Sequence, residues 1–385
     1  MEIKVAYKSK KIYPIVFLVL AAVTIISLRW ITYYSFYPSE PLINKIIIDL
    51  GDHMYFPFIL NSMKNIAVLT SGGDSPGMNA AIRSIVRTAN QSNVKVQGIE
   101  YGYKGLIKNN FIKLTPNNVG NTIHLGGTLL KSARSKEFYK KGGRKIAYKN
   151  IKKNNIDGLI VLGGDGSLTG ASIFSDEYNF PIIGIPCTID NDIYGTDHSL
   201  GFATARETIV NAIDKIRDTA SSHDRIFIVE VMGRNSGNLA LEAGISSGAE
   251  MILIPEINLD IDTVINNISK INKKKKSIII VYAEGCNYGP AYEFANTIEN
   301  KIKNSNVRYS ILGHVQRGGI PVPSDRILGS ILGYKAIEIL LKGESKKMIG
   351  YKNMDYNIIS IKDSISKHKN IDKKLYEIAE IISKQ

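Results

Sequence analysis

Residues 64–83 read KNIAVLTSGGDSPGMNAAIR, and they predict a strand, a turn and a helix in succession. Residues 66–70 form a short apolar run that is typical of a buried strand, and residues 78–90 have helical spacing. Residues 157–167, DGLIVLGGDGS, repeat the design, with a helix expected from about residue 168. Strands that alternate with helices predict an α/β fold with parallel sheets and right-handed crossovers.

The rest of the chain continues this alternation. Further apolar strands are expected in residues 181–186, 225–233 and 277–285 and at the start of residues 307–319, and a long helix in residues 202–220. The runs are continuously apolar, which favours strands that are covered on both faces. Glycines and carboxylates follow the strands, and in open α/β sheets ligands bind beyond the carboxyl ends of the strands. We therefore expect the functional site there.

Composition limits the class of protein. The chain has 385 residues, 22% of them charged and 44% hydrophobic, which excludes intrinsic disorder and leaves room for two domains. The formal net charge of +14 favours an anionic partner, although scattered lysines on solvated faces account for much of such an excess. Two cysteines, Cys187 and Cys286, form no disulfide framework or metal motif, so we expect buried thiols in a cytoplasmic protein.

The first 62 residues do not match the rest. Residues 12–28 are almost wholly apolar, but this run is at the lower limit for a transmembrane helix, which needs about 20 residues. Basic residues precede the run and Trp30 follows it, as in an inserted helix. Three interpretations stay open: an upstream in-frame start, so that this stretch is not part of the natural protein, which we favour; a membrane anchor; and a tail. We expect residues 1–62 to lie outside the enzyme fold, with Met63 as a natural start of that fold.

Two glycine-rich turns have the composition of phosphate-binding loops. Residues 71–77 (SGGDSPG) connect a strand to a helix, where backbone N–H groups and the helix N-terminus favour an anion. Residues 163–167 (GGDGS) add a carboxylate, Asp165, which can hold a Mg²⁺ that bridges phosphates. The alternative for Asp165 is a helix N-cap. The chain contains no GxxxxGK[ST] motif, which argues against a P-loop kinase.

A third motif, TIDND (residues 188–192), places two carboxylates after a buried strand. A general base must be fixed within hydrogen-bond reach of the hydroxyl that it deprotonates, and a strand end can provide this. The alternative is an Asx-turn that only caps the loop. Basic side chains near other strand ends could hold a phosphate ester through guanidinium forks; they are Arg225, Arg234, Arg308, His314 and Arg317.

From residue 63 onward the chain resembles the bacterial ATP-dependent 6-phosphofructokinases. The matching motifs are LTSGGDSPGMNAAIR (69–83), GGDGS (163–167), TIDND (188–192), IDKIRDTASSHDR (213–225), EVMGRNSG (230–237), GAEMILIPE (248–256) and GHVQRGG (313–319). The resemblance implies two similar Rossmann-like parallel-sheet domains with the active site in the cleft between them. Residues 63–385 would form two interleaved subdomains, a larger one for ATP and a smaller one for fructose 6-phosphate.

The resemblance also implies a reaction and its residues. ATP phosphorylates the 1-hydroxyl of fructose 6-phosphate, the committed step of glycolysis, with Mg²⁺ as cofactor on Asp165. Asp190 is implied as the general base, with Thr188 and Arg234 as further catalytic residues. The implied ATP-binding residues are Gly73, Tyr103, Arg134, Ser135, Gly164, Asp165, Gly166 and Ser167. The implied substrate-binding residues are Thr188, Ile189, Asp190, Arg225, Met232, Gly233, Arg234, Glu284, Arg308, His314, Val315, Gln316 and Arg317.

Assembly and regulation follow from the same resemblance. In the family, the counterparts of Arg225 and Arg308 come from a neighbouring subunit, which implies a homotetramer. An effector site for ADP or phosphoenolpyruvate is implied at Arg83, Arg87, Arg217, Gly248, Glu250, Lys274, Lys275 and Lys276. Leu125, Ser135-Lys136 and Asn121 depart from the family pattern, and these departures put regulation in doubt more than catalysis.

Three alternatives remain. A pyrophosphate-dependent enzyme of the same fold is disfavoured because pyrophosphate users carry Asp at Gly166 and tend to carry Lys at Cys187. An NAD or lipid kinase shares the GGDG loop but lacks the TIDND and GHVQRGG segments. A nucleic-acid-binding protein is motivated only by the net charge, and we expect no nucleic-acid partner.

Overall fold

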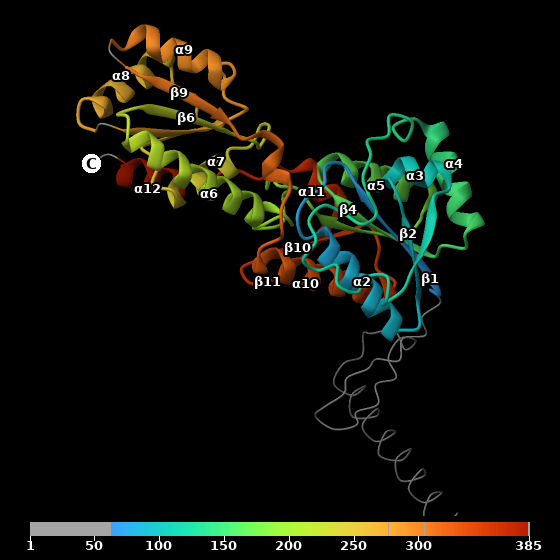
Figure 1. The fold of residues 1–385 in the computed structure, drawn as a ribbon. Helices are drawn as coiled ribbons and strands as arrows, with labels where there is room; N and C mark the ends of the chain where they lie inside the picture. Colours follow the sequence, from blue (N-terminus) through green and yellow to red (C-terminus); the bar gives the residue numbers. More distant parts are fainter. Residues whose placement is uncertain (1–62, 276, 304, 384–385) are drawn as a thin grey trace, which may run out of the picture. The chain divides into compact units, whose positions relative to one another are not determined.

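The computed structural model describes residues 63–275, 277–303 and 305–383 (Figure 1). The expected extension of residues 1–62, with its apolar run 12–28, lies outside the described residues, as does Lys276. Among the residues that are described, no helix has both the length and the apolar character that crossing a membrane requires.

The larger sheet has the strand order β11-β10-β5-β4-β1-β2-β3. Its parallel strands are β1 (Asn65–Ser71), β2 (Lys95–Ile99), β4 (Gly158–Gly163), β5 (Ile182–Pro186) and β10 (Lys347–Lys352). The edge strands β3 (Phe111–Leu114) and β11 (Asp355–Ser360) pair antiparallel with β2 and β10. The expected parallel sheet is thus confirmed, while its antiparallel edges were not anticipated.

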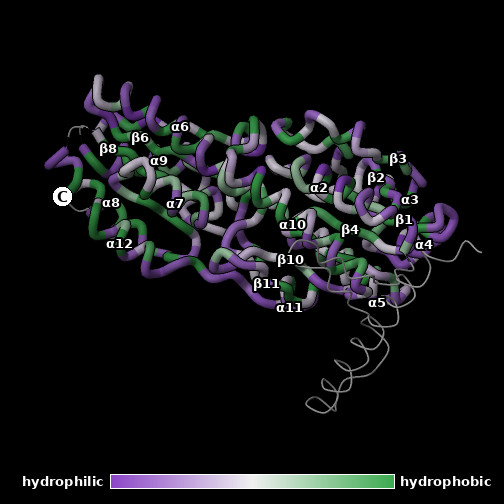
Figure 2. The backbone as a smooth tube through the Cα atoms, turned by 90° about the horizontal axis from the view of Figure 1, so that it is seen from below, coloured by the Kyte–Doolittle hydropathy of each residue, from purple (hydrophilic) through white to green (hydrophobic). Residues whose placement is uncertain are grey.

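Helices cover both faces of the larger sheet. Ile66 and Val68 belong to one apolar cluster with residues of α2 (Met78–Gln91) and α10 (Pro323–Leu341). Ala67 and Leu69, which alternate with them along β1, belong to another. That second cluster includes residues of α3 (Gly102–Lys108), α4 (Lys141–Lys153), α5 (Asp165–Tyr178) and α11 (Ile361–Ser366). Because successive side chains of a strand point to opposite faces, a continuously apolar strand is required here. Figure 2 shows the hydrophobic character of β4 at the centre of this arrangement.

The smaller sheet is wholly parallel, in the order β7-β8-β6-β9. Its strands are β6 (Ile226–Val231), β7 (Met251–Leu253), β8 (Ile278–Ala283) and β9 (Val307–Ile311). One apolar cluster joins them to α6 (Phe202–Ser221), α7 (Asn238–Ser246), α8 (Ile261–Asn272), α9 (Ala291–Lys301) and α12 (Lys373–Ser383). We refer to each sheet with its helices as the larger and the smaller lobe.

The chain passes repeatedly between the two lobes. It crosses between β5 and α6, between the 3₁₀ helix η1 (Gly313–Arg317) and α10, and again between α11 and α12. The last crossing, residues 367–372, returns the C-terminal helix to the smaller lobe, where Tyr376 and Ala379 enter the apolar cluster.

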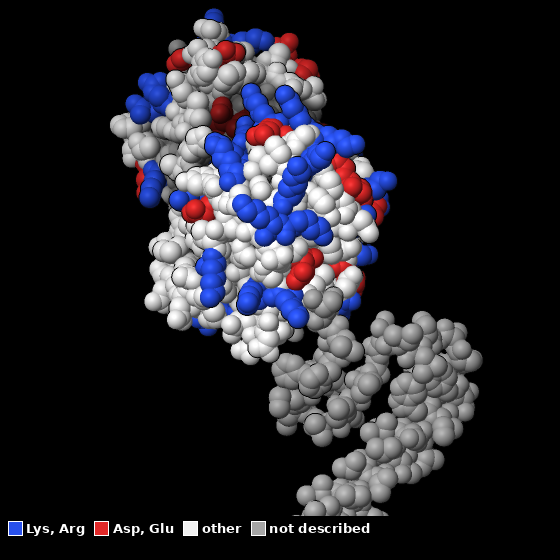
Figure 3. Space-filling model, turned by 90° about the vertical axis from the view of Figure 1, so that its right-hand side faces the viewer, with Lys and Arg blue, Asp and Glu red and all other residues white. Residues whose placement is uncertain are grey.

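Basic and acidic side chains both lie on the face of the molecule that a space-filling view shows (Figure 3). On the face drawn in Figure 3, basic side chains are spread out, with neutral surface and acidic side chains between them. On this face the pattern is typical of solvated lysines.

Candidate active site

The glycine-rich turns meet at the carboxyl ends of three neighbouring strands. Ser71 of β1 is in register with Gly163 of β4, and Gly163 is in register with Pro186 of β5. The turns that follow these residues therefore lie side by side. A side chain at Gly163 would collide with the Ser71 carbonyl oxygen and with Ser167, each 2.6 Å from its Cβ position, so close approach of the turns requires glycine here.

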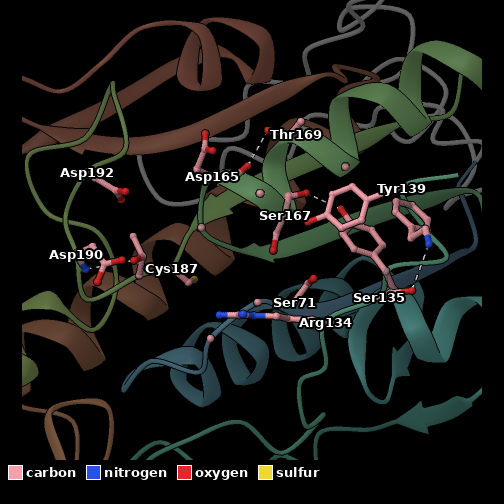
Figure 4. A pocket seen from close by; sticks show the side chains of 18 of the residues that line it. Ser71, Arg134, Ser135, Tyr139, Asp165, Ser167, Thr169, Cys187, Asp190 and Asp192 are labelled. Carbon is pink, nitrogen blue, oxygen red and sulfur yellow. Dashed lines mark hydrogen bonds between the residues drawn. The ribbon is translucent and has the colours of Figure 1, made fainter. Parts of the chain in front are cut away.

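These turns border a cavity of about 520 Å³ (Figure 4). The expected nucleotide and catalytic residues among its lining are Gly73, Tyr103, Arg134, Ser135, Gly164, Asp165, Gly166, Ser167, Thr188, Asp190, Arg234 and Arg317. The structure brings together residues that lie up to 244 positions apart in the sequence, from Gly73 to Arg317. Arg317 reaches across to Gly73, where any side chain would meet its guanidinium, and its Nη1 donates to the Asp74 carbonyl at 3.3 Å.

Asp190 is the buried carboxylate of the cavity. Its side chain is 4% exposed, and its Oδ1 has no hydrogen-bond partner among the described residues. Arg234 Nε lies 3.8 Å from Oδ2, and Arg317 Nη2 lies 4.0 Å from Oδ1. Burial raises the pKa of Asp190 and the charge of Asp192 raises it further, while both arginines lower it. A buried carboxylate with a free oxygen and a raised pKa is suited to accept a proton.

Asp165 and Asp192 face the same cavity (Figure 4). Asp165 is the first residue of α5, and Gly164 is the N-cap residue, so the N-cap interpretation of Asp165 was wrong. Helix α5 also begins earlier than expected, because the Gly164 carbonyl already accepts from the Ser167 and Leu168 N–H groups. Although Asp192 opens onto the cavity, desolvation by the surrounding protein raises its pKa, and the charge of Asp165 raises it further.

One wall of the cavity is aromatic. Tyr103 is buried, stacks on Phe138 with ring centroids 3.9 Å apart, and donates from its hydroxyl to the Ser167 carbonyl at 2.6 Å. Arg144 donates to the carbonyl oxygens of Phe138 and Tyr139 and pairs with Glu177 at 2.7 Å, which fixes this loop. The Tyr139 side chain, 73% exposed, borders the cavity.

Arg234 borders the cavity from the smaller lobe, and hydrogen bonds hold the segment that carries it. Glu284 accepts hydrogen bonds from the Gly233 and Arg234 N–H groups at 3.2 and 2.8 Å. The buried Gln316 accepts from the Met232 N–H group at 3.1 Å. The expected sugar-site residues are thus connected to one another. Met232, Gly233, Glu284 and Gln316 hold Arg234 in place rather than lining the cavity themselves.

Other expected substrate residues lie away from the cavity. Arg308 pairs in register with Phe227 near the start of β6, and Arg225 immediately precedes that strand. Arg234 follows the opposite end of β6, so about 17–20 Å of strand separates the two sets. Ile189 is fully buried, and His314 and Val315 are exposed on η1 outside the lining.

The expected effector residues divide between the lobes. Arg217 donates to the carbonyl oxygens of Ser247 and Gly248 at 2.8 Å and lies 3.5 Å from Glu250, which also pairs with Lys275 at 3.3 Å. Gly248, Glu250 and Lys275 border a second cavity of about 110 Å³, closed partly by α12. Lys274 is exposed beside it, whereas Arg83 and Arg87 lie on α2 in the larger lobe.

Sequence reasoning missed several lining residues: Phe138, Tyr139, Arg144, Thr169, Gly170 and Ile173. Ser71 and Gly72 belong to the predicted phosphate-binding turn, and Cys187 was weighed as a donor-discriminating position, but none of the three was named as a binding residue. Asp192 was quoted in its motif but given no role. The expectation of buried thiols is confirmed, because both cysteines are free and buried, and burial raises the pKa of Cys286 to about 12. Phe138 could have been found from the aromatic pattern after Arg134, while the others depend on tertiary contacts.

Known proteins with similar sequences identify the family of this chain. The phosphofructokinase family model matches residues 65–340. The chain is 49% identical over 295 residues to "ATP-dependent 6-phosphofructokinase 2" of Bacteroides thetaiotaomicron, which covers 76% of this chain and 90% of that protein. It is 53% identical over 293 residues to an "ATP-dependent 6-phosphofructokinase" of Staphylococcus epidermidis, with the same coverage.

Solved structures share the fold. Phosphofructokinase from Saccharomyces cerevisiae matches with a TM-score of 0.74 and 36% identity; the match covers 83% of this chain, which spans 46% of the yeast chain. A pyrophosphate-dependent phosphofructokinase from Marinobacter aquaeolei matches with a TM-score of 0.72 at 22% identity, covers 81% of this chain and 86% of that chain, and shows the fold alone. The family model and the bacterial relatives together show that this chain belongs to the phosphofructokinase family.

Proposed function

We propose that the chain transfers the γ-phosphoryl group of ATP to the 1-hydroxyl of fructose 6-phosphate, forming ADP and fructose 1,6-bisphosphate. The observation that carries the proposal is that Oδ1 of buried Asp190, in the same cavity as the glycine-rich turns, has no hydrogen-bond partner in the described part of the chain. Buried polar atoms are nearly always hydrogen-bonded, so a free carboxylate oxygen there indicates a missing substrate donor. A sugar hydroxyl is such a donor.

In this reaction Asp190 accepts the proton of the 1-hydroxyl as its oxygen attacks the γ-phosphorus. The bond from that phosphorus to the bridging oxygen breaks, and ADP leaves with the electron pair. Arg234 and Arg317, which lie 3.8 and 4.0 Å from Asp190, stabilise the negative charge of the transferring group. Thr188 donates its hydroxyl to the same group. The Gly73 and Gly164–Gly166 backbone and Arg134 would hold the other phosphates.

The residues also fit Mg²⁺. Asp165 and Asp192 present carboxylates to one cavity. Desolvation raises the pKa of Asp192, and repulsion by the like charge of Asp165 raises it further. Asp165 would hold the ion, with Asp192 facing it. When bound, Mg²⁺ supplies positive charge that neutralises the phosphate oxygens. Desolvation within the cavity strengthens each of these electrostatic contacts.

ATP is the donor that the sequence favours over pyrophosphate. This chain has Gly166 where pyrophosphate users carry Asp. A Cβ atom added at Gly166 would lie 4.0 Å from the Tyr139 hydroxyl and would meet no other atom within that distance, so the space beside Gly166 is free. The relatives named as ATP-dependent are 49–53% identical, whereas the pyrophosphate-dependent structures are 18–22% identical.

The donor assay tests the proposal directly. We expect the purified protein to form fructose 1,6-bisphosphate from fructose 6-phosphate with ATP and Mg²⁺, and at least about 100-fold more slowly with pyrophosphate. The product would be measured by aldolase coupling and ADP by pyruvate kinase coupling. Faster turnover with pyrophosphate would overturn the donor assignment, and absence of turnover with both donors would overturn the reaction.

The position of Arg225 and Arg308 supports a shared site. Both lie a strand length from Arg234, so they cannot reach the sugar in the cavity of their own chain. Arg225 is half-buried, and its Nε has no hydrogen-bond partner among the described residues. These features suit side chains that complete the phosphate site of a neighbouring subunit, in a homotetramer.

Replacing Arg308 with Ala should therefore raise the KM for fructose 6-phosphate far more than the KM for ATP. The loss of one charged partner of a desolvated phosphate costs about 2–5 kcal/mol. Lys303→Ala removes an exposed charge nearby and serves as the control. Mixing Arg308→Ala with Asp190→Asn subunits should regenerate some complete sites, and verified hybrids without recovered activity would contradict sharing across an interface.

Regulation, location and pathway complete the proposal. The cluster of Arg217, Gly248, Glu250 and Lys275 supports an effector site for ADP or phosphoenolpyruvate, to which Arg83 and Arg87 of a neighbouring subunit would contribute. Lys276, also expected there, lies outside the described residues. We place the enzyme in the cytoplasm and in glycolysis, where both substrates are water-soluble.

A further inference from the structure

The turn that carries Asp190 is held by the smaller lobe at its beginning. The Ser236 hydroxyl donates to the Asp190 carbonyl at 2.9 Å, and the Asn238 side chain donates to the Asn191 carbonyl at 3.0 Å. Asn191 has a φ of 51°, a left-handed conformation that costs free energy for a residue other than glycine. Contacts must therefore hold the backbone next to Asp190 in this conformation.

The far end of the same turn is held at several points. The Asp197 N–H group donates to the Tyr351 carbonyl at 2.9 Å, and Asp197 Oδ2 accepts from the Asn353 N–H group at 2.8 Å. The Asp197 carbonyl connects this end of the turn to Asn191. The Asp197 carbonyl accepts from the Asn191 side chain at 3.0 Å and from Lys369 Nζ at 2.6 Å. The Asn191 side chain also accepts from the Ser199 N–H group at 2.9 Å. Lys369 and Asn191, the residue that follows Asp190, thus donate to the same carbonyl oxygen.

Lys369 belongs to the last crossing between the lobes, residues 367–372. His368 forms an antiparallel bridge with Ile193, so this segment lies directly along the turn. The segment connects α11, which packs on α5 in the larger lobe, to α12 in the smaller lobe. A group here contacts the turn at the point where the two lobes are joined.

We propose that Lys369 is a positioning residue for Asp190: its ammonium group clamps the Asp197 carbonyl and so fixes the turn that aims the carboxylate at the sugar hydroxyl. The inference rests on the proposed function. Lys369 is not among the residues that line the cavity, so it would act on Asp190 through the backbone of the turn. Small displacements of a reacting group are costly, since about 1 Å can lower a rate by about 100-fold.

The lowered pKa of Lys369 provides a way to test its role, because a positioning effect of the charged ammonium group should depend on pH. Burial lowers the pKa of Lys369 to about 8, against the opposing charges of Asp197, Glu242 and Asp192. His198 and Arg206 face the same group of charges. Between pH 8 and the ordinary lysine pKa the unfolded chain binds more protons, so stability rises with pH there, and the charged form is a cost to the fold at neutral pH. A residue that lowers folding stability but lies beside a catalytic group is typical of a functional site, where activity is favoured over stability.

The test compares Lys369→Met with Lys374→Met, which removes the same charge from an exposed position on α12. We expect Lys369→Met to lower kcat about 10-fold at pH 7 and to leave both KM values within about twofold. Lys369→Arg should restore most of kcat. The kcat of the wild type should fall above about pH 8, and this decrease should be absent in Lys369→Met and move to higher pH in Lys369→Arg.

Two further measurements do not depend on activity. The melting temperature of Lys369→Met should equal or exceed that of the wild type, because Asn191 still satisfies the Asp197 carbonyl. Amide hydrogen exchange in residues 188–199 should be several-fold faster in Lys369→Met and unchanged in Lys374→Met. Exchange tests the clamp even if the wild type failed the donor assay, which would overturn the proposed function instead.

A kcat of Lys369→Met within twofold of the wild type would overturn the positioning role. So would a loss of kcat accompanied by an equally large loss in Lys374→Met, or by a fall in melting temperature of more than a few degrees, since both indicate a general structural effect. Unchanged exchange in residues 188–199 would overturn the clamp itself.

Discussion

Asp190→Asn lowers kcat by roughly 10²–10⁴-fold, the scale expected for the loss of a positioned general base. An amide has almost the same shape as the carboxylate but cannot accept the hydroxyl proton. The KM for fructose 6-phosphate should change much less, because the carboxylate acts mainly in the transition state. Steady-state kinetics with the coupled assay give both quantities, and a kcat within fivefold of the wild type would remove Asp190 from the role of base.

The pH dependence of Asp190 gives a second signature. Its pKa is raised in the folded protein, so kcat of the wild type should fall as the pH decreases through that raised pKa, and this acid limb should be missing in Asp190→Asn. A raised carboxyl pKa also means that folding stability falls as pH rises through the same window. The Asn variant should therefore be at least as stable at neutral pH. Asp176→Asn, at an exposed site paired with Lys346, is the control that should change neither property.

Asp165→Ala should reduce turnover to the background level at every Mg²⁺ concentration while the protein remains folded. Asp165 is exposed at the first turn of α5, so its removal costs the fold only about 0.3–1 kcal/mol of helix-dipole interaction. The loss of the carboxylate instead removes the group that would hold the ion against the phosphates.

Asp260→Ala is the matched control for Asp165→Ala. Asp260 is the N-cap of α8 and accepts from the Thr263 N–H group at 2.8 Å, outside the cavity. Its replacement should cost about 0.5–2 kcal/mol of stability with turnover unchanged. Asp165→Ala should thus lose Mg²⁺-dependent turnover with little change in thermal unfolding, whereas Asp260→Ala should lose thermal stability and keep its turnover. If Asp165→Ala kept its Mg²⁺-dependent turnover, the ion would have to be held elsewhere.

Much of the site could be predicted because its chemistry lies in short segments at strand ends. The turns after β1, β4 and β5 are glycine-rich in the sequence, and parallel neighbouring strands bring their carboxyl ends together. Asp190 follows a buried strand, so both its burial and its place at the sheet edge could be inferred. The fold class followed from the alternation of apolar strands with helices.

Other features depended on contacts between distant segments. The antiparallel edges β3 and β11 are short, and nothing in their local pattern gives strand direction. Tyr139 borders the cavity only because Arg144 holds its carbonyl group. Lys369 looks like any lysine of a basic chain until the structure places it on the Asp197 carbonyl. The start of α5 at Asp165 was missed because Gly164 adopts an extended conformation that no side chain specifies.

The repeated passage of the chain between its lobes bears on how such a protein can evolve. The larger sheet is assembled from strands on both sides of β6–β9 in the sequence, and α12 of the smaller lobe follows the last strand of the larger sheet, so no single breakpoint in the gene separates one lobe intact. Exchange of the smaller lobe by recombination therefore needs more than one breakpoint, unlike exchange in enzymes whose domains follow one another. Point substitution around Arg234 and Glu284 is therefore the simpler route to a change of acceptor.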